Sequence, residues 1–501
     1  MAKASEMRRI LPPELQKAQV EIRELARSYG LDCFDIMFEL VDYNEINEIA
    51  ALGGFPTRYP HWRFGMEYDY LNKTYTYGLQ KIYELVINND PCYAYLQMGN
   101  ELVDQKLVMA HVMGHCDFFK NNMWFSKTNR KMLDEMANHA TRIREYQDRY
   151  GVDNVENFID ACCSIDNLID PHSPFVQKKT DKEPLVPNPF DEEANIRKFQ
   201  SKDYMDKYVN PRAFLEEQEK KLRADQEKAR KFPTHPERDI LKFLIDYAPL
   251  EHWQRETLSI IREEAYYFSP QGQTKIMNEG WASYWHSFLM TNHILKDSEI
   301  IDYADHHSGT LGTRPGQINP YKLGIELYRD IEDRWNKGKF GKEYDECDDI
   351  NEKKNWDKKL GLGRQKIFEV RKLHNDVTFI DSFMNEEFCE QQKLFTYAFN
   401  RRSGQYEIVD RDWRKVKQQL LFSLSNFGQP IIHVEDGNYE NRGDLLLGHR
   451  HEGVDLEYDK AVETLKNIQL FWRRPVHLYT KYNSQPKILS FDGKEFREKD
   501  A

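Results

Sequence analysis

The chain has 501 residues, of which 40% are hydrophobic and 31% charged, and its formal net charge is −12. This length exceeds what one simple core needs and predicts two or three structural units. The acidic balance disfavours a general nucleic-acid binder, whose surface is normally basic, and the aromatic content of 13% argues against wholesale disorder.

The cysteines and the N-terminal residues are those expected of a protein in a reducing compartment. The seven cysteines form no C-x-x-C motif, which is typical of free thiols in a reducing environment. The first ten residues lack the apolar stretch of a signal peptide, and no run of about eighteen apolar residues occurs. We therefore expect a soluble cytoplasmic protein that binds neither nucleic acid nor membranes.

The first hundred residues predict helices followed by a short strand. Residues 12–28 begin with prolines and continue with helix formers, and residues 34–50 carry apolar side chains at helical spacing. Residues 85–91 are predicted to end a further helix, and residues 92–98 alternate like a strand. That strand either lies buried in a hairpin or offers its edge to an extended peptide.

A helix predicted over residues 101–119, with Asn100 as its cap, carries His111 and His115. Their spacing of four residues places both imidazoles on one face. This is the ligand half of the H-E-x-x-H zinc helix, whose glutamate acts as general base, but Val112 occupies the glutamate position. The alternative is a histidine pair that makes polar contacts inside a helical bundle.

Two neighbours of the histidines favour a functional site. Gly114 permits close approach of another backbone, and Asp117 is a candidate acceptor for a hydrogen bond from a ligand. The charged helix predicted over residues 128–150 either faces water or supports the site through Glu135 and His139, and the acids of the helix predicted over 155–168 either form a carboxylate cluster or face water. Residues 177–238 are charged and rich in proline, which predicts an exposed insertion.

A second metal-bearing helix is predicted at residues 275–286, after helices over 239–248 and 250–268 and a break over 269–272. A zinc site on two helical histidines takes its third ligand from elsewhere, and Glu279 fits that role. The alternative for Glu279 is a first-turn carboxylate favoured by the helix dipole. His286 would orient substrate or bind metal, and His306 and His307 would either stabilise an oxyanion or cap a helix.

The last third of the chain predicts a small α+β unit. Strands are expected at residues 378–380, 394–399, 406–409, 431–434, 445–447, 476–482 and 487–491, and helices at 411–425 and 459–472. We predict an α+β fold with a mainly helical domain over 1–365, which holds a metallopeptidase-like two-helix metal site, and a C-terminal domain over 366–501.

Four segments of the chain resemble the stage V sporulation protein R family. They are residues 111–122, 136–144, 262–268 and 277–286, and the likeness extends over nearly the whole chain. The resemblance implies a link to spore cortex formation in spore-formers, although relatives also occur in bacteria that make no spores. It implies no particular reaction.

We expect His111, His115 and Glu279 to hold one zinc ion, with a coordination position left for water. The reaction would then be metal-assisted hydrolysis of an amide or peptide bond, for example in a peptidoglycan-precursor-like substrate. The missing base would be replaced by Glu264, or by Glu263, and the electrophilic partner would be His286 or His306.

Two alternatives remain open at this point. Val112 favours a non-catalytic, degenerate metallopeptidase fold that binds a peptide, a peptidoglycan precursor or a regulatory protein, the last through the C-terminal domain. A two-metal site that also uses Glu135, His139 and Glu264 would instead indicate redox chemistry.

Overall fold

The computed structural model of the chain describes residues 11–76, 84–176, 232–312 and 316–501, with isolated positions between 211 and 220. The fold is mixed α+β, as the sequence predicts. Contacts divide the chain into two compact units, one of Met1–Glu156 with Tyr266–Gln429 and the other of Asn157–Ala265 with Pro430–Ala501. This grouping differs from the predicted division at residue 365, and most of the predicted insertion at 177–238 lies outside the described residues.

The first unit contains a three-stranded sheet in the order β1-β3-β2. Strands β1 (Ile36–Val41) and β3 (Cys92–Gln97) are parallel, whereas β2 (Leu85–Ile87) is antiparallel to β3. The predicted hairpin strand at residues 92–98 is confirmed. Because both edges of β3 are paired, the idea that it offers an edge to a peptide is wrong.

Two helix predictions near this sheet are also wrong. Residues 34–50 hold β1 and then the helix α3 (Tyr43–Ala51), which begins at a capping box formed by Asp42 and Glu45. Residues 85–91 form β2 and a turn instead of a helix end. Short apolar runs fit helix and strand equally well, and here pairing with β3 decides the outcome.

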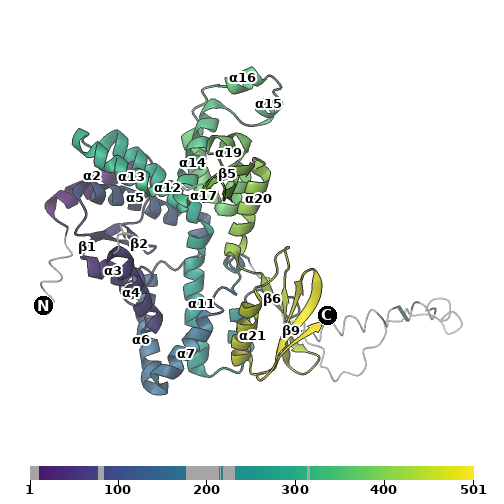
Figure 1. Cartoon of the computed structure of the whole chain (residues 1–501). Coiled ribbons are helices and arrows are strands. Elements are labelled where there is room, and N and C mark those ends of the chain that lie inside the picture. Colours follow the sequence, from purple (N-terminus) through teal and green to yellow (C-terminus); the bar gives the residue numbers. More distant parts are fainter. Residues whose placement is uncertain are drawn as a thin grey trace, which may run out of the picture. The chain divides into compact units, whose positions relative to one another are not determined.

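Three helices form the centre of the first unit, α5 (Leu102–Asn121), α12 (Lys275–Leu289) and α14 (Pro320–Lys337). Helix α12 packs against both α5 and α14 (Figure 1). The large side chains Trp281, Trp285, Phe118 and Tyr328 are fully buried in this core. Helices α2 (Pro13–Ser28) and α17 (Gly363–Leu373) pack against α5 and α14, respectively.

Glycines allow these central helices to touch backbone to backbone. A Cβ atom on Gly114 would lie 2.6 Å from the Cα of Ala282, so α5 and α12 meet as predicted from Gly114. A Cβ atom on Gly280 would lie 2.4 Å from the Cα of Gly324, where α12 meets α14. Because the opposing atoms belong to the backbone, no side chain can be accommodated by a rotamer change.

The start of α12 is capped from a distant part of the chain. The carboxylate of Asp376 accepts hydrogen bonds of 2.8 Å from the backbone N–H groups of Ile276 and Met277. Burial raises the pKa of Asp376 to about 7, although these hydrogen bonds favour its charged form. Asp376 itself begins the helix α18 (Asp376–Phe383), so the strand predicted at residues 378–380 is wrong.

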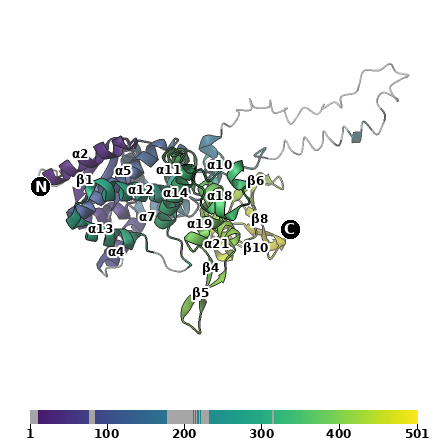
Figure 2. The same cartoon turned by 90° about the horizontal axis from the view of Figure 1, so that it is seen from above.

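The remaining elements of the first unit surround this core. They are α4 (Trp62–Thr76), α6 (Met132–Tyr150), α13 (Ile300–Thr310), α15 (Lys342–Asp345), α16 (Ile350–Lys354), α19 (Glu386–Gln391), α20 (Trp413–Leu424), β4 (Thr396–Asn400) and β5 (Gln405–Asp410). Strands β4 and β5 form a hairpin that projects from the helices (Figure 2). Helices α7 (Val152–Cys163) and α11 (His252–Gln273) contribute residues to both units. Helix α11 continues through Pro270, where a break was expected.

The second unit is built on a five-stranded sheet in the order β10-β9-β8-β7-β6. Its strands are β6 (Ile432–Tyr439), β7 (Asp444–His449), β8 (Val476–Tyr482), β9 (Gln485–Phe491) and β10 (Phe496–Asp500), the last not predicted. Strands β7 and β8 are parallel and joined through α21 (Tyr458–Trp472), which packs on β8 and β9. The ring of Trp472 stacks on Phe243 of α10 (Ile240–Tyr247).

Within the described part of the chain, every helix is too short or too polar to cross a membrane.

We predict that Gly280→Ala lowers the stability of the protein by about 2 kcal/mol or more, because the new methyl group meets the backbone of α14. Gly309→Ala in α13 is the matched control, since a Cβ there meets nothing within 4 Å. Alanine in a helix is favoured over glycine, so the control should be neutral or slightly stabilising. Thermal unfolding of both variants tests this, and equal melting temperatures would contradict the packing argument.

Candidate metal centre

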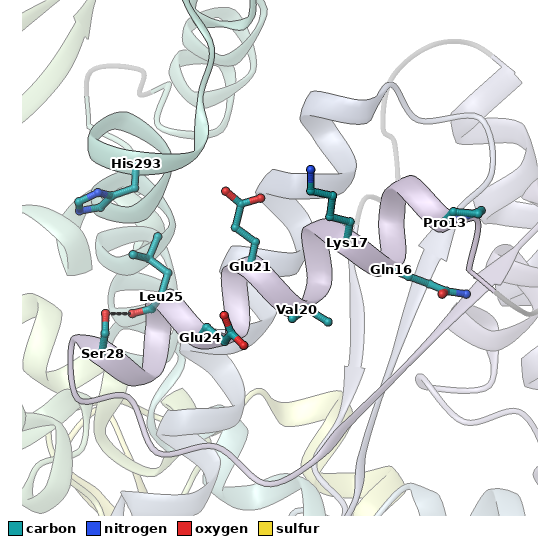
Figure 3. A pocket seen from close by; sticks show the side chains of 9 residues that line it. All are labelled: Pro13, Gln16, Lys17, Val20, Glu21, Glu24, Leu25, Ser28 and His293. Atoms are coloured by element: carbon teal, nitrogen blue, oxygen red, sulfur yellow. Dashed lines mark hydrogen bonds between the residues drawn. The ribbon is translucent and has the colours of Figure 1, made fainter.

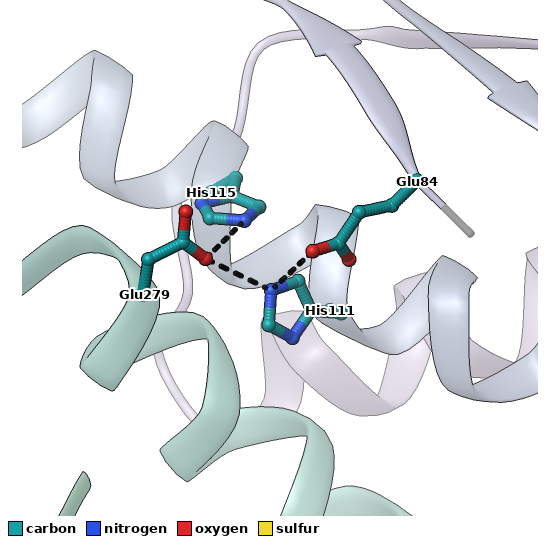
Figure 4. A group of neighbouring side chains, drawn as sticks. All are labelled: Glu84, His111, His115 and Glu279. Atoms are coloured by element: carbon teal, nitrogen blue, oxygen red, sulfur yellow. Dashed lines mark ion pairs between the residues drawn. The ribbon is translucent and has the colours of Figure 1, made fainter. Parts of the chain in front are cut away.

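Four side chains from three segments of the first unit converge on one point (Figure 4). His111 and His115 come from α5, Glu279 comes from α12, and Glu84 directly precedes β2. One ligand atom of each residue lies within 4.8 Å of the ligand atoms of the others. Among the described residues, no second group of at least three potential metal ligands meets this condition. We call these four residues the metal-ligand group.

The distances within the metal-ligand group suit a small cation held between its members. The Oε1 atom of Glu84 lies 3.3 Å from Nε2 of His111. The Oε2 atom of Glu279 lies 3.6 Å from Nε2 of His111 and 3.5 Å from Nε2 of His115. Both His111 Nε2 and Glu279 Oε2 are buried without a hydrogen-bond partner, which is costly unless a ligand satisfies them.

Burial shifts the pKa values of two members of the group, His111 and Glu84. It lowers the pKa of His111 well below its ordinary value, so the imidazole is neutral and carries a lone pair that can bind a metal. Burial also raises the pKa of Glu84, and the nearby charge of Glu279 raises it further. The two carboxylates thus face each other at a cost that a divalent cation would remove. The chemistry of two imidazole nitrogens and two carboxylate oxygens fits zinc.

Neighbouring side chains orient the ligands. The Nδ1 atom of His115 lies 2.9 Å from Oδ1 of Asn278. Because this oxygen can only accept, Nδ1 carries the proton and Nε2 is left free to face Glu279. The phenol of Tyr321, at the start of α14, lies near the side chains of Glu279 and Glu84. Burial and the charges of Glu279 and Glu84 raise the pKa of Tyr321, so it remains a donor.

Asp117 makes hydrogen bonds that hold helices together and does not orient a metal ligand. Its carboxylate accepts hydrogen bonds of 2.8 Å from Trp281 Nε1 and 3.3 Å from Arg371. It also accepts from the backbone N–H of Asp32. Burial raises the pKa of Asp117 to about 6 despite these partners. The expectation that Asp117 binds a metal ligand is therefore replaced by a structural role that connects α5, α12 and α17.

The segment 279–282 concentrates several of these contacts in one turn of α12. Glu279 enters the metal-ligand group, Gly280 touches α14, Trp281 donates to Asp117, and Ala282 touches Gly114. The helix is thus fixed on three sides around the ligand. A shift of α12 would disturb all four contacts together.

The other predicted site residues lie outside the metal-ligand group. His286 is buried on α12, with its Nδ1 2.7 Å from Nδ1 of His111. His306 lies on α13 and is hydrogen-bonded to Asp104.

The candidates for the replacement base and for a second metal ion lie on other helices. Glu263 and Glu264 are on α11, in residues that belong to the second unit, so their role as base stays a prediction. Glu135 and His139 lie on α6 and are not members of the metal-ligand group.

Sequence reasoning missed Glu84. It stands 27 positions before His111, and no spacing rule connects a residue before a strand to a helix that follows it. The sequence points to such a residue only indirectly: Val112 occupies the glutamate position of the motif, so a base has to come from another segment.

Two surface hollows elsewhere in the first unit contain none of the predicted site residues. An open groove of about 890 Å³ lies along the outer face of α2 (Figure 3). It is lined by charged side chains such as Lys17, Glu21 and Glu24, and by His293. A second hollow of about 520 Å³ lies among residues 316–323, 392–397 and 416–423. The metal-ligand group, with its buried unpaired atoms, is the stronger candidate for a functional site.

Comparison with known proteins gives a consistent result. The family model described as SpoVR like protein matches residues 10–429, and the model described as SpoVR-like C-terminal domain matches residues 430–483. The chain belongs to the SpoVR family. The resemblance expected from the four sequence segments is confirmed, and the junction of the two family models coincides with the change of compact unit after Gln429.

A relative of this SpoVR chain is the uncharacterized protein YcgB of Escherichia coli (strain K12). The two are 31% identical over 480 residues, which cover 90% of this chain and 89% of YcgB. No solved structure matches the chain.

We predict that Asn278→Ala weakens zinc binding by about tenfold or more, because His115 loses the acceptor that fixes its proton on Nδ1. Competition with a chromogenic chelator measures the affinity. The control is Asn292→Ala, an exposed asparagine in the turn that follows α12. Equal affinities in the two variants would show that Asn278 does not orient the ligand.

Proposed function

We propose that the protein is a metal-dependent hydrolase of amide or peptide bonds, with one zinc ion held by the metal-ligand group. The observation that carries this proposal is the convergence of Glu84, His111, His115 and Glu279 around buried atoms that lack hydrogen-bond partners. A bound zinc ion would supply Lewis acidity, lowering the pKa of a water molecule and polarising a carbonyl group. His111, His115 and Glu279 are its proposed ligands, as the sequence predicts.

Glu84 takes the place of the base that Val112 cannot supply. Val112 is fully buried and aliphatic, so the position after His111 offers no carboxylate. Glu84 reaches the same histidine face from the sheet, 3.3 Å from Nε2 of His111. A carboxylate at this point would accept a proton from an attacking water and return it to the leaving amine. Glu264 and Glu263 are not members of the metal-ligand group, so Glu84 is the base proposed here.

Tyr321 takes the role of electrophilic partner, the group that stabilises the oxyanion, for which the sequence favours His286 or His306. Its phenol adjoins Glu279 and remains protonated because its pKa is raised. An O–H group beside the ligands would donate a hydrogen bond to the oxyanion that develops on an attacked carbonyl. His306 is engaged with Asp104, and His286 contacts His111 on the side away from the metal-ligand group.

The substrate class proposed is a short peptide. The family's link to the spore cortex makes peptidoglycan-derived peptides suitable first substrates, together with simple peptides. The same metal site without turnover would describe a binding protein, and measurements of metal content and of peptide turnover together separate these cases.

We expect one zinc atom per chain in protein purified without added metal, and loss of that atom in His111→Ala and in Glu279→Ala. Each substitution removes a ligand atom that no other side chain in the metal-ligand group replaces. His252→Ala is the control, because His252 is strongly exposed on α11. Metal analysis of the purified proteins gives the result, and full metal content in Glu279→Ala would refute the ligand set.

For turnover, we predict that Glu84→Gln reduces peptide hydrolysis by about a hundredfold or more while zinc is retained, because an amide cannot accept the proton. Glu48→Gln, exposed on α3, is the matched control. Glu264→Gln tests the base that the sequence favoured.

Each other outcome of this comparison has a definite meaning. Loss of zinc in Glu84→Gln would make Glu84 a fourth ligand. Unchanged turnover would remove it from the mechanism, and zinc-bound wild-type protein that hydrolyses no peptide would overturn the hydrolase proposal.

A further inference from the structure

Three histidines connected in series lead away from the metal-ligand group. The Nδ1 atom of His111 lies 2.7 Å from Nδ1 of His286, and Nε2 of His286 lies 3.1 Å from Nδ1 of His307. His111 and His286 are buried, whereas His307 on α13 is half-buried. The series, which we call the histidine chain, therefore connects the centre of the unit to its surface.

A metal ion at His111 would give the histidine chain one direction. Metal binding uses the lone pair of His111 Nε2, so the ring proton has to lie on Nδ1. This N–H donates to Nδ1 of His286, which places the proton of His286 on Nε2. That second N–H then donates to Nδ1 of His307. One set of tautomers thus satisfies every link.

Another arrangement breaks the histidine chain. If His111 carries its proton on Nε2, its Nδ1 accepts from Nδ1–H of His286. The Nε2 atom of His286 then has no proton to donate to His307, and the outer link is lost unless His307 also changes tautomer. The proton position on His111 therefore sets the direction of the outer hydrogen bond, and with the proton on Nε2 of His111 that bond is kept only at the cost of a change in the tautomer of His307.

Helix α13 is attached to the unit mainly through polar contacts. Tyr303 is its one buried side chain. Besides the contact between His307 and His286, His306 is hydrogen-bonded to Asp104 on α5. Just before the helix, Glu299 accepts a hydrogen bond of 2.8 Å from Lys106 of α5. A helix with so few buried apolar contacts opens more easily than its neighbours, so one hydrogen bond weighs heavily in its docking.

We propose that His286 and His307 are positioning residues that couple metal binding at His111 to the docking of helix α13. This coupling rests on the proposed metal site but not on catalysis. A bound metal selects the tautomers that donate outward to His307. By thermodynamic linkage, docked α13 holds His111 in the tautomer that binds metal, and so strengthens metal binding to the same extent.

The test compares zinc affinities by chelator competition in wild-type protein, His307→Ala and His307→Gln. We expect His307→Ala to weaken zinc binding by about tenfold or more, the range observed for residues that orient metal ligands. The glutamine variant should recover most of the loss, because its side-chain oxygen accepts from Nε2–H of His286. His293→Gln is the histidine control, since His293 is exposed and bonded to Tyr29 outside the histidine chain.

Hydrogen exchange supplies a second readout that a general loss of stability would not reproduce. In wild-type protein, zinc should slow amide exchange in residues 300–310, and in His307→Ala zinc should leave that exchange unchanged. Wild-type zinc affinity in His307→Ala, or zinc-independent exchange of α13 in wild-type protein, would overturn the coupling. Wild-type protein that binds no zinc would overturn the metal site as well, whereas normal zinc binding that is insensitive to His307 would overturn the coupling alone.

Discussion

The backbone-to-backbone packing of α12 between α5 and α14 is the constraint on which the rest of the first unit depends. At Gly114 and at Gly280, even a single methyl group would overlap the main chain of the neighbouring helix. Close approach of this kind leaves no slack for α12 to slide or rotate, because protein interiors are packed as densely as organic crystals. The carboxylate of Glu279 is therefore carried to the two histidines by the geometry of the helices and not by a flexible loop. The proposed metal site would thus have its ligands held in place by rigid elements before an ion binds.

Buried polar contacts add specificity to this packing. Asp117 and Asp376 are both buried carboxylates whose pKa values are raised, to about 6 and about 7, and each is satisfied by several donors. One joins α5 to Trp281 and Arg371, and the other caps the start of α12. Buried charges of this kind contribute little net stability. Leaving one of their hydrogen-bond donors unpaired costs free energy, however, so other positions and rotations of α12 are disfavoured. The metal-ligand group differs from these carboxylates, because its partnerless atoms and two further ligand atoms converge on one point. Its unpaired atoms at His111 and Glu279 are the sign of a ligand.

In zinc peptidases of the H-E-x-x-H type, a single helix carries both the histidine ligands and the glutamate base, whereas the site proposed here takes them from two segments. Here α5 carries the two histidines, whereas the carboxylate nearest to His111 comes from Glu84, the residue before β2. The opposite side of His111 is occupied by His286, so an imidazole stands where a carboxylate or a carbonyl commonly accepts from a metal-bound histidine. An imidazole differs from those acceptors because its second nitrogen can make a further hydrogen bond, and here that nitrogen lies 3.1 Å from Nδ1 of His307 on α13.

The sequence by itself determined the features that depend on local periodicity and on recognisable motifs. These are the shared face of His111 and His115, the helix that carries Glu279, the close approach at Gly114, the mixed α+β class and membership of the SpoVR family. Tertiary structure alone decided what depends on contacts between distant segments. Glu84 lies beside the histidines because β2 pairs with β3, and residues 36–41 form a strand because β1 pairs with the other edge of β3. Residues 376–383 form a helix whose first residue, Asp376, caps α12. Short apolar runs carry no preference strong enough to choose between helix and strand, so long-range pairing and burial make that choice.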